Sequence, residues 1–400
     1  MMDLKVFLIL CVVPCVLSQC VMKKAEPQLR RAIYDFSIEL LTRIAQEKEN
    51  HFVASTLSPW TLLSCLSLGA ADNTLAELKH VLKLHYHKCF NNLYLEIVSK
   101  INSNSDPHVT VERSAVMFAD EELSINDAFK NRIASTGISD IEVISLGYAD
   151  AAAAMINNYV SRATHNAVED MVNPSDLEDV YLVMIDALFF KGTWETPFVA
   201  EETETSPFYN ERGVQIGDVN LMFVNGMFHE KSIDQIDANV LELPYGNSGR
   251  YSALFFVPYP DVPVYNVIEK LKLITLTTIF KQFDEKESVM VQIPRFKIVS
   301  DLNNMRELLR DMGLESMFVS EQARFPYLSD DNLSVSEFFQ KASIEVTEEG
   351  TTASAATAAE LVSRSFPIKY TANKPFLFMI VDKVYEVPLF AGAYSKPSEY

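Results

Sequence analysis

The apolar positions of the chain follow a helical period over several long stretches. Within residues 30–46 the apolar side chains recur at near-helical spacing with charges between them, which predicts an amphipathic helix. Two further helices are predicted, one over 150–162 with Asp150 as its N-cap and one over 301–312 with Gly313 as a left-handed C-cap. Most of the helical signal lies in the first half of the chain.

Strand signals dominate the second half. Val289, Val291 and Ile293 alternate with polar neighbours, and residues 376–381 are continuously apolar, as in a strand buried on both faces. Helices come early and strands late without a βαβ alternation, so the predicted class is α+β. Because neither a Gly/Ser/Pro-rich linker nor a repeat divides the chain, we expect one large domain over residues 20–400.

Composition agrees with a large folded protein. The chain has 400 residues, 48% of them hydrophobic, with 25 Phe and 16 Tyr, which is enough to build a large core. The net charge of −20 argues against a general nucleic-acid binder, which needs a basic surface to neutralise phosphates.

The N-terminus has the pattern of an export signal. Lys5 precedes an apolar run over 6–17, and the small residues Val16 and Ser18 suit a cleavage site. This run is too short to span a bilayer, and Pro14 argues against a buried helix. We therefore expect residues 1–19 to be a signal peptide cleaved near Ser18, and the mature protein to be secreted, extracellular and not bound to a membrane.

Cysteines and one sequon bear on the exported chain. After loss of the signal peptide, Cys20, Cys65 and Cys89 remain, so at most one disulfide forms, and Cys20–Cys89 is one pairing that these allow. Cys65 lies in an apolar run, where a small buried side chain is expected. Asn332 begins an Asn-Leu-Ser sequon, which predicts glycosylation in an exported protein.

The segment 350–359 differs from the rest of the chain because it contains neither a charge nor a large apolar residue. A flexible linker would have little to connect so near the C-terminus, and four Thr and Ser residues without an apolar stripe disfavour a helix. The third interpretation is a segment that is exposed in one state and buried as a strand in another.

Residues 348–357 resemble the hinge of the serpin reactive loop. The hinge residues are Glu348, Glu349, Gly350, Thr351, Thr352, Ala353, Ser354, Ala355, Ala356 and Thr357. Further serpin-like motifs occur elsewhere in the chain, in the same order and at the same spacing as in the family. They lie at 186–198, 243–245, 293–296, 312–314 and 374–378. The resemblance covers about residues 28–396. It implies a serpin fold with three β-sheets, about nine helices and an exposed reactive loop at about 348–369.

The resemblance also implies a mechanism. In this family a protease attacks the loop and forms an acyl-enzyme, after which the cut loop inserts into the main sheet and distorts the protease. The attacked residue is the seventeenth from the hinge Glu, which here is Arg364, followed by Ser365. An exposed arginine suits a trypsin-like specificity pocket. We therefore expect a suicide inhibitor of trypsin-like serine proteases with Arg364–Ser365 as the reactive bond.

Strand periodicity supports an insertable loop. Alternate residues of an inserting strand face the core. Counted back from Arg364, the inward set is small or apolar, namely Thr351, Ala353, Ala355, Thr357, Ala359 and Leu361. The one charge, Glu360, has the outward parity, so insertion buries no unpaired carboxylate.

The sheet-opening region departs from the family pattern. Asp186 stands where the family has Asn, and Gln340 stands where it has His, while Trp194 follows the pattern at the top of the sheet. An Asp–Gln pair can still hydrogen-bond, with the amide as donor. The pair could open the sheet faster or slower than the family's Asn–His pair, and the sequence is compatible with both.

Three alternatives remain to be weighed. An enzyme is disfavoured because none of the seven histidines lies in an HExxH motif or a nucleophile elbow. His80, His85, His87 and Cys89 have a loose metal-like spacing, but a polar helix end explains them better, so we expect neither cofactor nor metal. A non-inhibitory serpin, or a loop that is cleaved without trapping the protease, would rest on Asp186 and Gln340 alone.

Lys79, Lys83 and Lys88 offer a weak polyanion site of the kind that some serpins carry there. We expect the protein to be a monomer.

Overall fold

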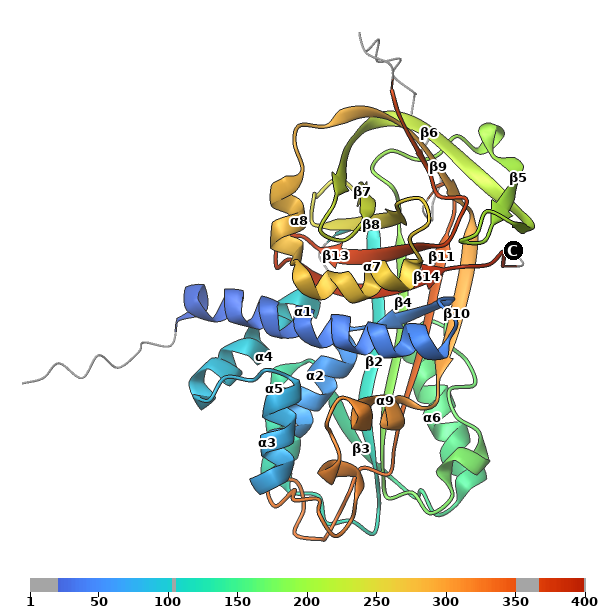
Figure 1. Cartoon of the computed structure of the whole chain (residues 1–400). Helices are drawn as coiled ribbons and strands as arrows, with labels where there is room; N and C mark the ends of the chain where they lie inside the picture. Colours follow the sequence, from blue (N-terminus) through green and yellow to red (C-terminus); the bar gives the residue numbers. More distant parts are fainter. Residues whose placement is uncertain (1–20, 103–105, 350–366, 399–400) are drawn as a thin grey trace, which may run out of the picture.

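Helices precede most of the strands along the chain, as in an α+β protein (Figure 1). The computed structural model describes residues 21–102, 106–349 and 367–398. Its α-helices there are α1 (Met22–Glu47), α2 (Leu57–Leu66), α3 (Asp72–Val81), α4 (Lys88–Asn102), α5 (Asp127–Thr136), α6 (Ala149–Ala163), α7 (Val264–Lys270), α8 (Leu276–Gln282) and α9 (Met305–Asp311). Its strands are β1 (Phe52–Ser55), β2 (Val109–Asp120), β3 (Asp140–Ile144), β4 (Leu182–Gly192), β5 (Glu204–Tyr209), β6 (Gln215–Ile233), β7 (Ala238–Tyr245), β8 (Tyr251–Pro258), β9 (Glu287–Pro294), β10 (Phe296–Leu302), β11 (Glu337–Val346), β12 (Ile368–Thr371), β13 (Phe376–Asp382) and β14 (Val387–Tyr394).

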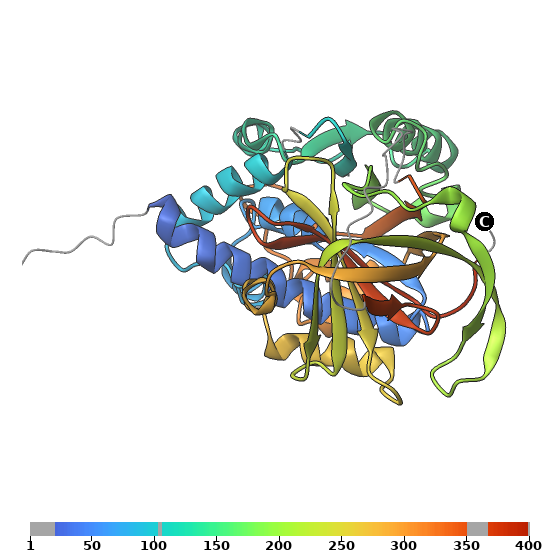
Figure 2. The same cartoon turned by 90° about the horizontal axis from the view of Figure 1, so that it is seen from above.

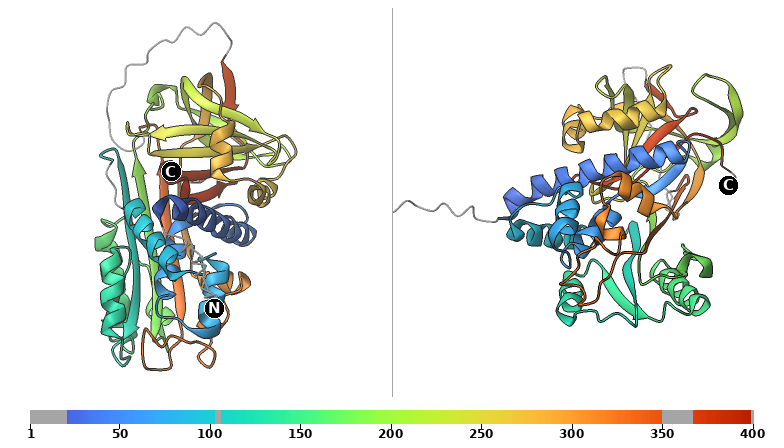
Figure 3. Two further views of the ribbon diagram at one scale, coloured as in Figure 1. Left: turned by 90° about the vertical axis from the view of Figure 1, so that its left-hand side faces the viewer. Right: turned by 60° about the horizontal axis from the view of Figure 1, so that its bottom comes forward.

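A five-stranded sheet runs along the length of the molecule (Figure 3). Its strand order is β10-β11-β4-β2-β3, and its central pair, β4 and β11, is parallel. Both faces of this sheet are covered. On one face, α6 packs Ile156 and Val160 against a cluster that includes Val183 and Ile185 of β4. On the other face lies α2, all of whose residues are buried.

A nine-stranded sheet forms the other half of the molecule. Its path is β1-β14-β13-β8-β7-β6-β9-β12, with β5 paired to β6. β6 is 19 residues long, pairing first with β5 and β9 and then, from His229 to Ile233, with β7. Two of the three expected sheets are thereby joined by one continuous strand, which curves round one side of the molecule (Figure 2). The predicted serpin fold is confirmed, and nine α-helices lie within the described ranges.

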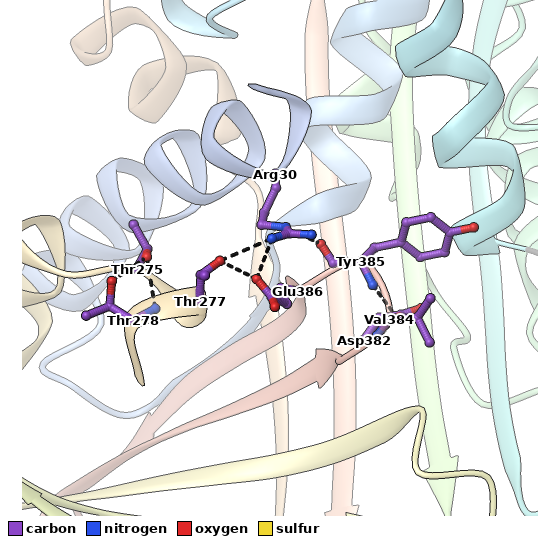
Figure 4. Close-up of polar contacts among 8 residues, drawn as sticks. All are labelled: Arg30, Thr275, Thr277, Thr278, Asp382, Val384, Tyr385 and Glu386. Atoms are coloured by element: carbon purple, nitrogen blue, oxygen red, sulfur yellow. Dashed lines mark hydrogen bonds and ion pairs between the residues drawn. The ribbon is translucent and has the colours of Figure 1, made fainter. Parts of the chain in front are cut away.

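α1 is fixed to the turn between β13 and β14 (Figure 4). Arg30 Nε donates to Tyr385 O at 3.0 Å, and Arg30 Nη1 lies 2.6 Å from Glu386 Oε2. The same Nη1 donates to Thr277 Oγ1 of α8 at 3.2 Å. These contacts join the first helix to the last hairpin across most of the sequence.

Two predicted helix starts need correction. Asp150 lies in the first turn of α6, and the N-cap is Tyr148, so the side chain of Asp150 does not cap the helix. α9 begins at Met305 because Asp301 and Leu302 extend strand β10, whose pairing with β11 outweighs the local helical pattern. Gly313 follows this helix at φ +104°, where a side chain would be strained, in agreement with the predicted left-handed cap.

Cys65 and Cys89 are in different states in the structure. Cys65 is a buried free thiol, as expected. Cys89 is disulfide-bonded, while Cys20 lies outside the described residues. Within the described residues, none of the helices has the length and apolar character needed to cross a bilayer.

Candidate functional site at the seam between β4 and β11

The parallel strands β4 and β11 lie side by side at the centre of the five-stranded sheet. Eight residue pairs run from Glu337↔Val183 to Ile344↔Phe190. We refer to this line of pairing as the seam. A strand that entered the seam in the opposite direction would make antiparallel ladders with both neighbours. The chain leaves β11 at Val346 and reaches Glu348 and Glu349 at the top of the seam.

The predicted pair Asp186 and Gln340 lies directly across the seam. The two residues are register partners, and both are fully buried. Gln340 Nε2 donates to Asp186 Oδ2 at 2.7 Å and to Ser55 O at 3.1 Å. The predicted contact is therefore present, with the amide as donor. Since it joins the two strands by their side chains, it must break when they separate.

Two residues outside the predicted sheet-opening set complete this buried cluster. Ser58, at the start of α2, donates from Oγ to Asp186 Oδ1 and accepts from Arg113 Nε at 2.7 Å. Arg113 lies on β2, diagonal to Asp186, because Ala115 is the register partner of Asp186. Both residues use the same sheet face. We call Ser58, Arg113, Asp186 and Gln340 the seam cluster.

The seam cluster holds two buried groups of opposite charge, Arg113 and Asp186, bridged by the Ser58 hydroxyl. Burial raises the pKa of the Asp186 carboxyl above 3.8, while Arg113 and the bonds from Ser58 and Gln340 oppose this rise. Burial likewise lowers the pKa of Arg113, against the attraction of Asp186. Nη1 and Nη2 of Arg113 are buried without a hydrogen-bond partner. Desolvation thus outweighs pairing at this site.

Trp194 fixes the top of the seam. Its Nε1 donates to Thr347 O at 2.9 Å, and its ring stacks on Tyr245 with the centroids 4.2 Å apart. The backbone nearby is also held, since Phe198 N donates to Glu348 O at 2.9 Å. Trp194 therefore holds the segment that joins β11 to the hinge.

Glu348, the first residue of the predicted hinge, is buried and held by its side chain. Oε1 accepts from Thr203 Oγ1 at 2.8 Å, and Oε2 lies 3.7 Å from Arg295 Nη1. Glu349, the next residue, is exposed. The Glu348 contacts lie at the end of the seam and tie it to the β9–β10 junction.

The remaining predicted site residues lie outside the seam cluster. Arg364, Ser365 and hinge residues 350–357 lie outside the described part of the chain. Asn332 is exposed in an irregular segment before β11. Lys83 and Lys88 are exposed and Lys79 is half-buried, all on or between α3 and α4.

Comparison with known proteins identifies the family. The family model described as "Serpin (serine protease inhibitor)" matches residues 31–397. The chain is a serpin. The family description names inhibitors of serine proteases and not enzymes, so the predicted class of protein is confirmed.

Named relatives and solved structures extend over nearly the whole chain. Serine protease inhibitor 2 of Anopheles gambiae is 29% identical over 372 residues, which cover 87% of this serpin and 88% of the relative. Human antithrombin-III is 28% identical over 393 residues, covering 92% and 82% of the two chains. Manduca sexta serpin-12 aligns with TM-score 0.80 at 26% identity over 92% of this chain and 98% of its own. Native protease nexin-1 with heparin aligns with TM-score 0.82 at 25% identity, over 94% and 100%.

Proposed function

We propose that this serpin is an extracellular suicide inhibitor of trypsin-like serine proteases with Arg364–Ser365 as its reactive bond. One observation carries the proposal: β4 and β11 pair directly, and β11 leads straight into the hinge at the top of the seam. The strand position between them is therefore unfilled over the eight paired positions and adjoins the segment meant to fill it.

The length of the loop suits the seam. Residues 351–362 form a stretch of twelve, against 11 residues in β4 and 10 in β11. At about 3.3 Å per residue such a strand extends roughly 40 Å, which is the length of the seam strands. After a turn at Glu349 the loop would run antiparallel to both β4 and β11.

The chemistry follows from the bait residue. The serine Oγ of the protease attacks the carbonyl carbon of Arg364, and the Arg364–Ser365 peptide bond breaks. The proton passes through the protease base to the departing nitrogen of Ser365, and Arg364 remains as an ester on the protease. Insertion of the loop then carries the ester-linked protease along the sheet before water can hydrolyse the ester.

A complex with trypsin tests the proposal. Mixing the two proteins should give an SDS-resistant species of roughly summed mass, and Arg364→Ala should abolish it. The matched control is Arg324→Ala, which removes an exposed arginine outside residues 348–369 and should leave the complex unchanged. If trypsin neither cleaves the protein nor forms a complex with it, Arg364–Ser365 is not a reactive bond for this protease. A complex that survives Arg364→Ala would show that another bond is attacked.

A second candidate function is a loop that is cleaved without trapping the protease. The seam cluster favours it, since the buried Asp186–Gln340 bond must break before insertion is complete, whereas Arg113 stays beside Asp186 on the paired strands β2 and β4. If opening is slower than deacylation, trypsin would release a cleaved chain and stay active. Cleavage without complex, in the same experiment, identifies this outcome or a serpin that inhibits nothing.

Secretion is part of the same proposal. The exposed Asn332 supports it, because a glycan there would meet solvent and not the core. When the whole chain is expressed in a cell with a secretory pathway, it should appear in the medium, and Asn332→Gln should lower its mass by one glycan. Retention inside the cell at unmodified mass would overturn this part.

We also propose weak polyanion binding at Lys79, Lys83 and Lys88. The heparin-bound relative protease nexin-1 supports the idea, as do the positions of the three lysines on or between α3 and α4. The chain's charge of −20 would limit the affinity and make it fall with salt.

A further inference from the structure

A pocket of about 600 Å³ is lined largely by residues on or next to α3, α4 and α5. Figure 1 shows these three helices in the same part of the molecule. Its volume is within the range of small-molecule sites. Its apolar wall comes from Leu68, Leu75, Leu84 and Phe129, with Tyr327, which is 60% exposed, at its mouth.

The wall of the pocket is held in place by backbone contacts. Tyr327 N donates to Gly69 O at 3.1 Å and Ala71 N to Arg324 O at 2.9 Å. A Cβ on Gly69 would approach Leu328 Cβ to 2.7 Å, so the two segments are in close contact. On the opposite side, the Asn91 amide bonds both His85 N and His85 O, which fixes the α3–α4 connection. The pocket is therefore formed before any ligand arrives.

The charged residues around this apolar wall are mainly cationic. Lys79, Lys88 and Arg132 line the pocket, against the single acidic residue Asp72. Among the described residues, neither Lys79 nor Lys88 has a carboxylate partner, and Arg132 donates only to Asn92 Oδ1, at 3.2 Å. The chain as a whole has a net charge of −20. The charge around this pocket is therefore opposite in sign to that of the whole chain.

From this combination we infer that the pocket binds an amphipathic anion, with an unbranched apolar tail against the leucines and Phe129 and a carboxylate between Lys79, Lys88 and Arg132. The apolar wall distinguishes this site from surface attraction of a polyanion, which needs no tail. Charge-assisted bonds from two lysines and an arginine distinguish it from adsorption of any apolar molecule. The inference does not depend on inhibitory activity.

Calorimetry of the mature chain tests the inference with three probes. Dodecanoate should bind with one site per chain, whereas acetate, which lacks the tail, and dodecyltrimethylammonium, which reverses the charge, should not bind measurably. Equal binding of the cationic probe, or several sites per chain, would overturn the inference.

Three variants locate the site. Lys79→Gln with Lys88→Gln should weaken dodecanoate binding by about tenfold or more. Ala128→Trp should abolish binding by filling the pocket from the exposed first turn of α5. The matched control Lys83→Gln removes a nearby exposed lysine that does not line the pocket and should change affinity by less than about twofold.

A sulfated polysaccharide separates the two kinds of anion. Its binding should weaken with Lys83→Gln and persist in Ala128→Trp, which is the reverse of dodecanoate. If Lys83→Gln weakens dodecanoate as much as the double variant does, or if Ala128→Trp leaves dodecanoate bound, the pocket is not the site.

Discussion

Gln340 Nε2 donates to Asp186 Oδ2 at 2.7 Å across two parallel strands that are also joined by their backbone ladder. The carboxylate is fully buried, and its other oxygen accepts from Ser58, which in turn accepts from Arg113. A single side-chain bond thus links the opening of the sheet to a charge pair beneath it.

Arg113→Met should destabilise the protein by about 3 kcal/mol, because it leaves the Asp186 carboxylate buried without a counter-charge. The second change Asp186→Asn should restore most of the loss, since it removes that charge. Urea unfolding of the four proteins in this double-mutant cycle measures the coupling.

The control for this cycle is Arg31→Met. Arg31 pairs with Asp35 on the surface of α1, with the Arg31 side chain 53% exposed, and should cost less than about 0.5 kcal/mol. A loss at Arg31 as large as that at Arg113, or no rescue by Asp186→Asn, would show that the seam cluster is not a coupled charge pair.

Acidification should favour the wild-type protein over Asp186→Asn. Burial raises the pKa of Asp186 in the folded state above 3.8, so the folded protein binds this proton more tightly than the unfolded chain does. Stability contributed by this group therefore falls as pH rises through the interval above 3.8 and returns as pH falls. Urea unfolding of the two proteins between about pH 7 and about pH 4 measures the difference, and a constant difference would be inconsistent with a raised pKa.

Glu348→Ala should weaken the closed seam by about 1–2 kcal/mol, because it removes the bond from Thr203 and the ion pair with Arg295. Spontaneous loss of inhibitory activity on warming should be faster for the same reason. Glu349→Ala is the matched control, since Glu349 is exposed, and should behave as wild type. If the two variants lose activity at the same rate, the contacts of Glu348 do not stabilise the closed seam.

The two tryptophans, Trp60 and Trp194, separate movement at the seam from movement elsewhere. Insertion should displace Thr347, so the fluorescence change on cleavage should come from Trp194, whose Nε1 bonds Thr347 O. Trp194→Phe should abolish the change. Trp60→Phe should retain it, because Trp60 bonds Leu82 O away from the seam. The opposite pattern would mean that the cleaved loop acts on α2 and not on the top of the sheet.

The sequence predicted the class of fold and one contact of the site well. Apolar periodicity located α1, and the family resemblance placed Asp186 opposite Gln340. Local pattern failed at residues 301–304, where pairing with β11 extends β10 into the predicted helix.

The rest of the seam cluster depends on long-range register. Arg113 meets Ser58 only because β2 and β4, about 70 residues apart, pair with Ala115 opposite Asp186. A one-residue slip would turn Arg113 to the other face of the sheet. The partners of Glu348 likewise come from Thr203 and Arg295, which no local pattern connects with the hinge.

The central claim is that the cut loop enters the seam, and the stability of the cleaved chain tests it most directly. After limited cleavage at Arg364–Ser365, thermal unfolding should shift upward by about 10 °C or more, because β4 and β11 each gain an antiparallel partner in place of their shared parallel ladder. An unfolding temperature that stays the same or falls on cleavage would contradict the account.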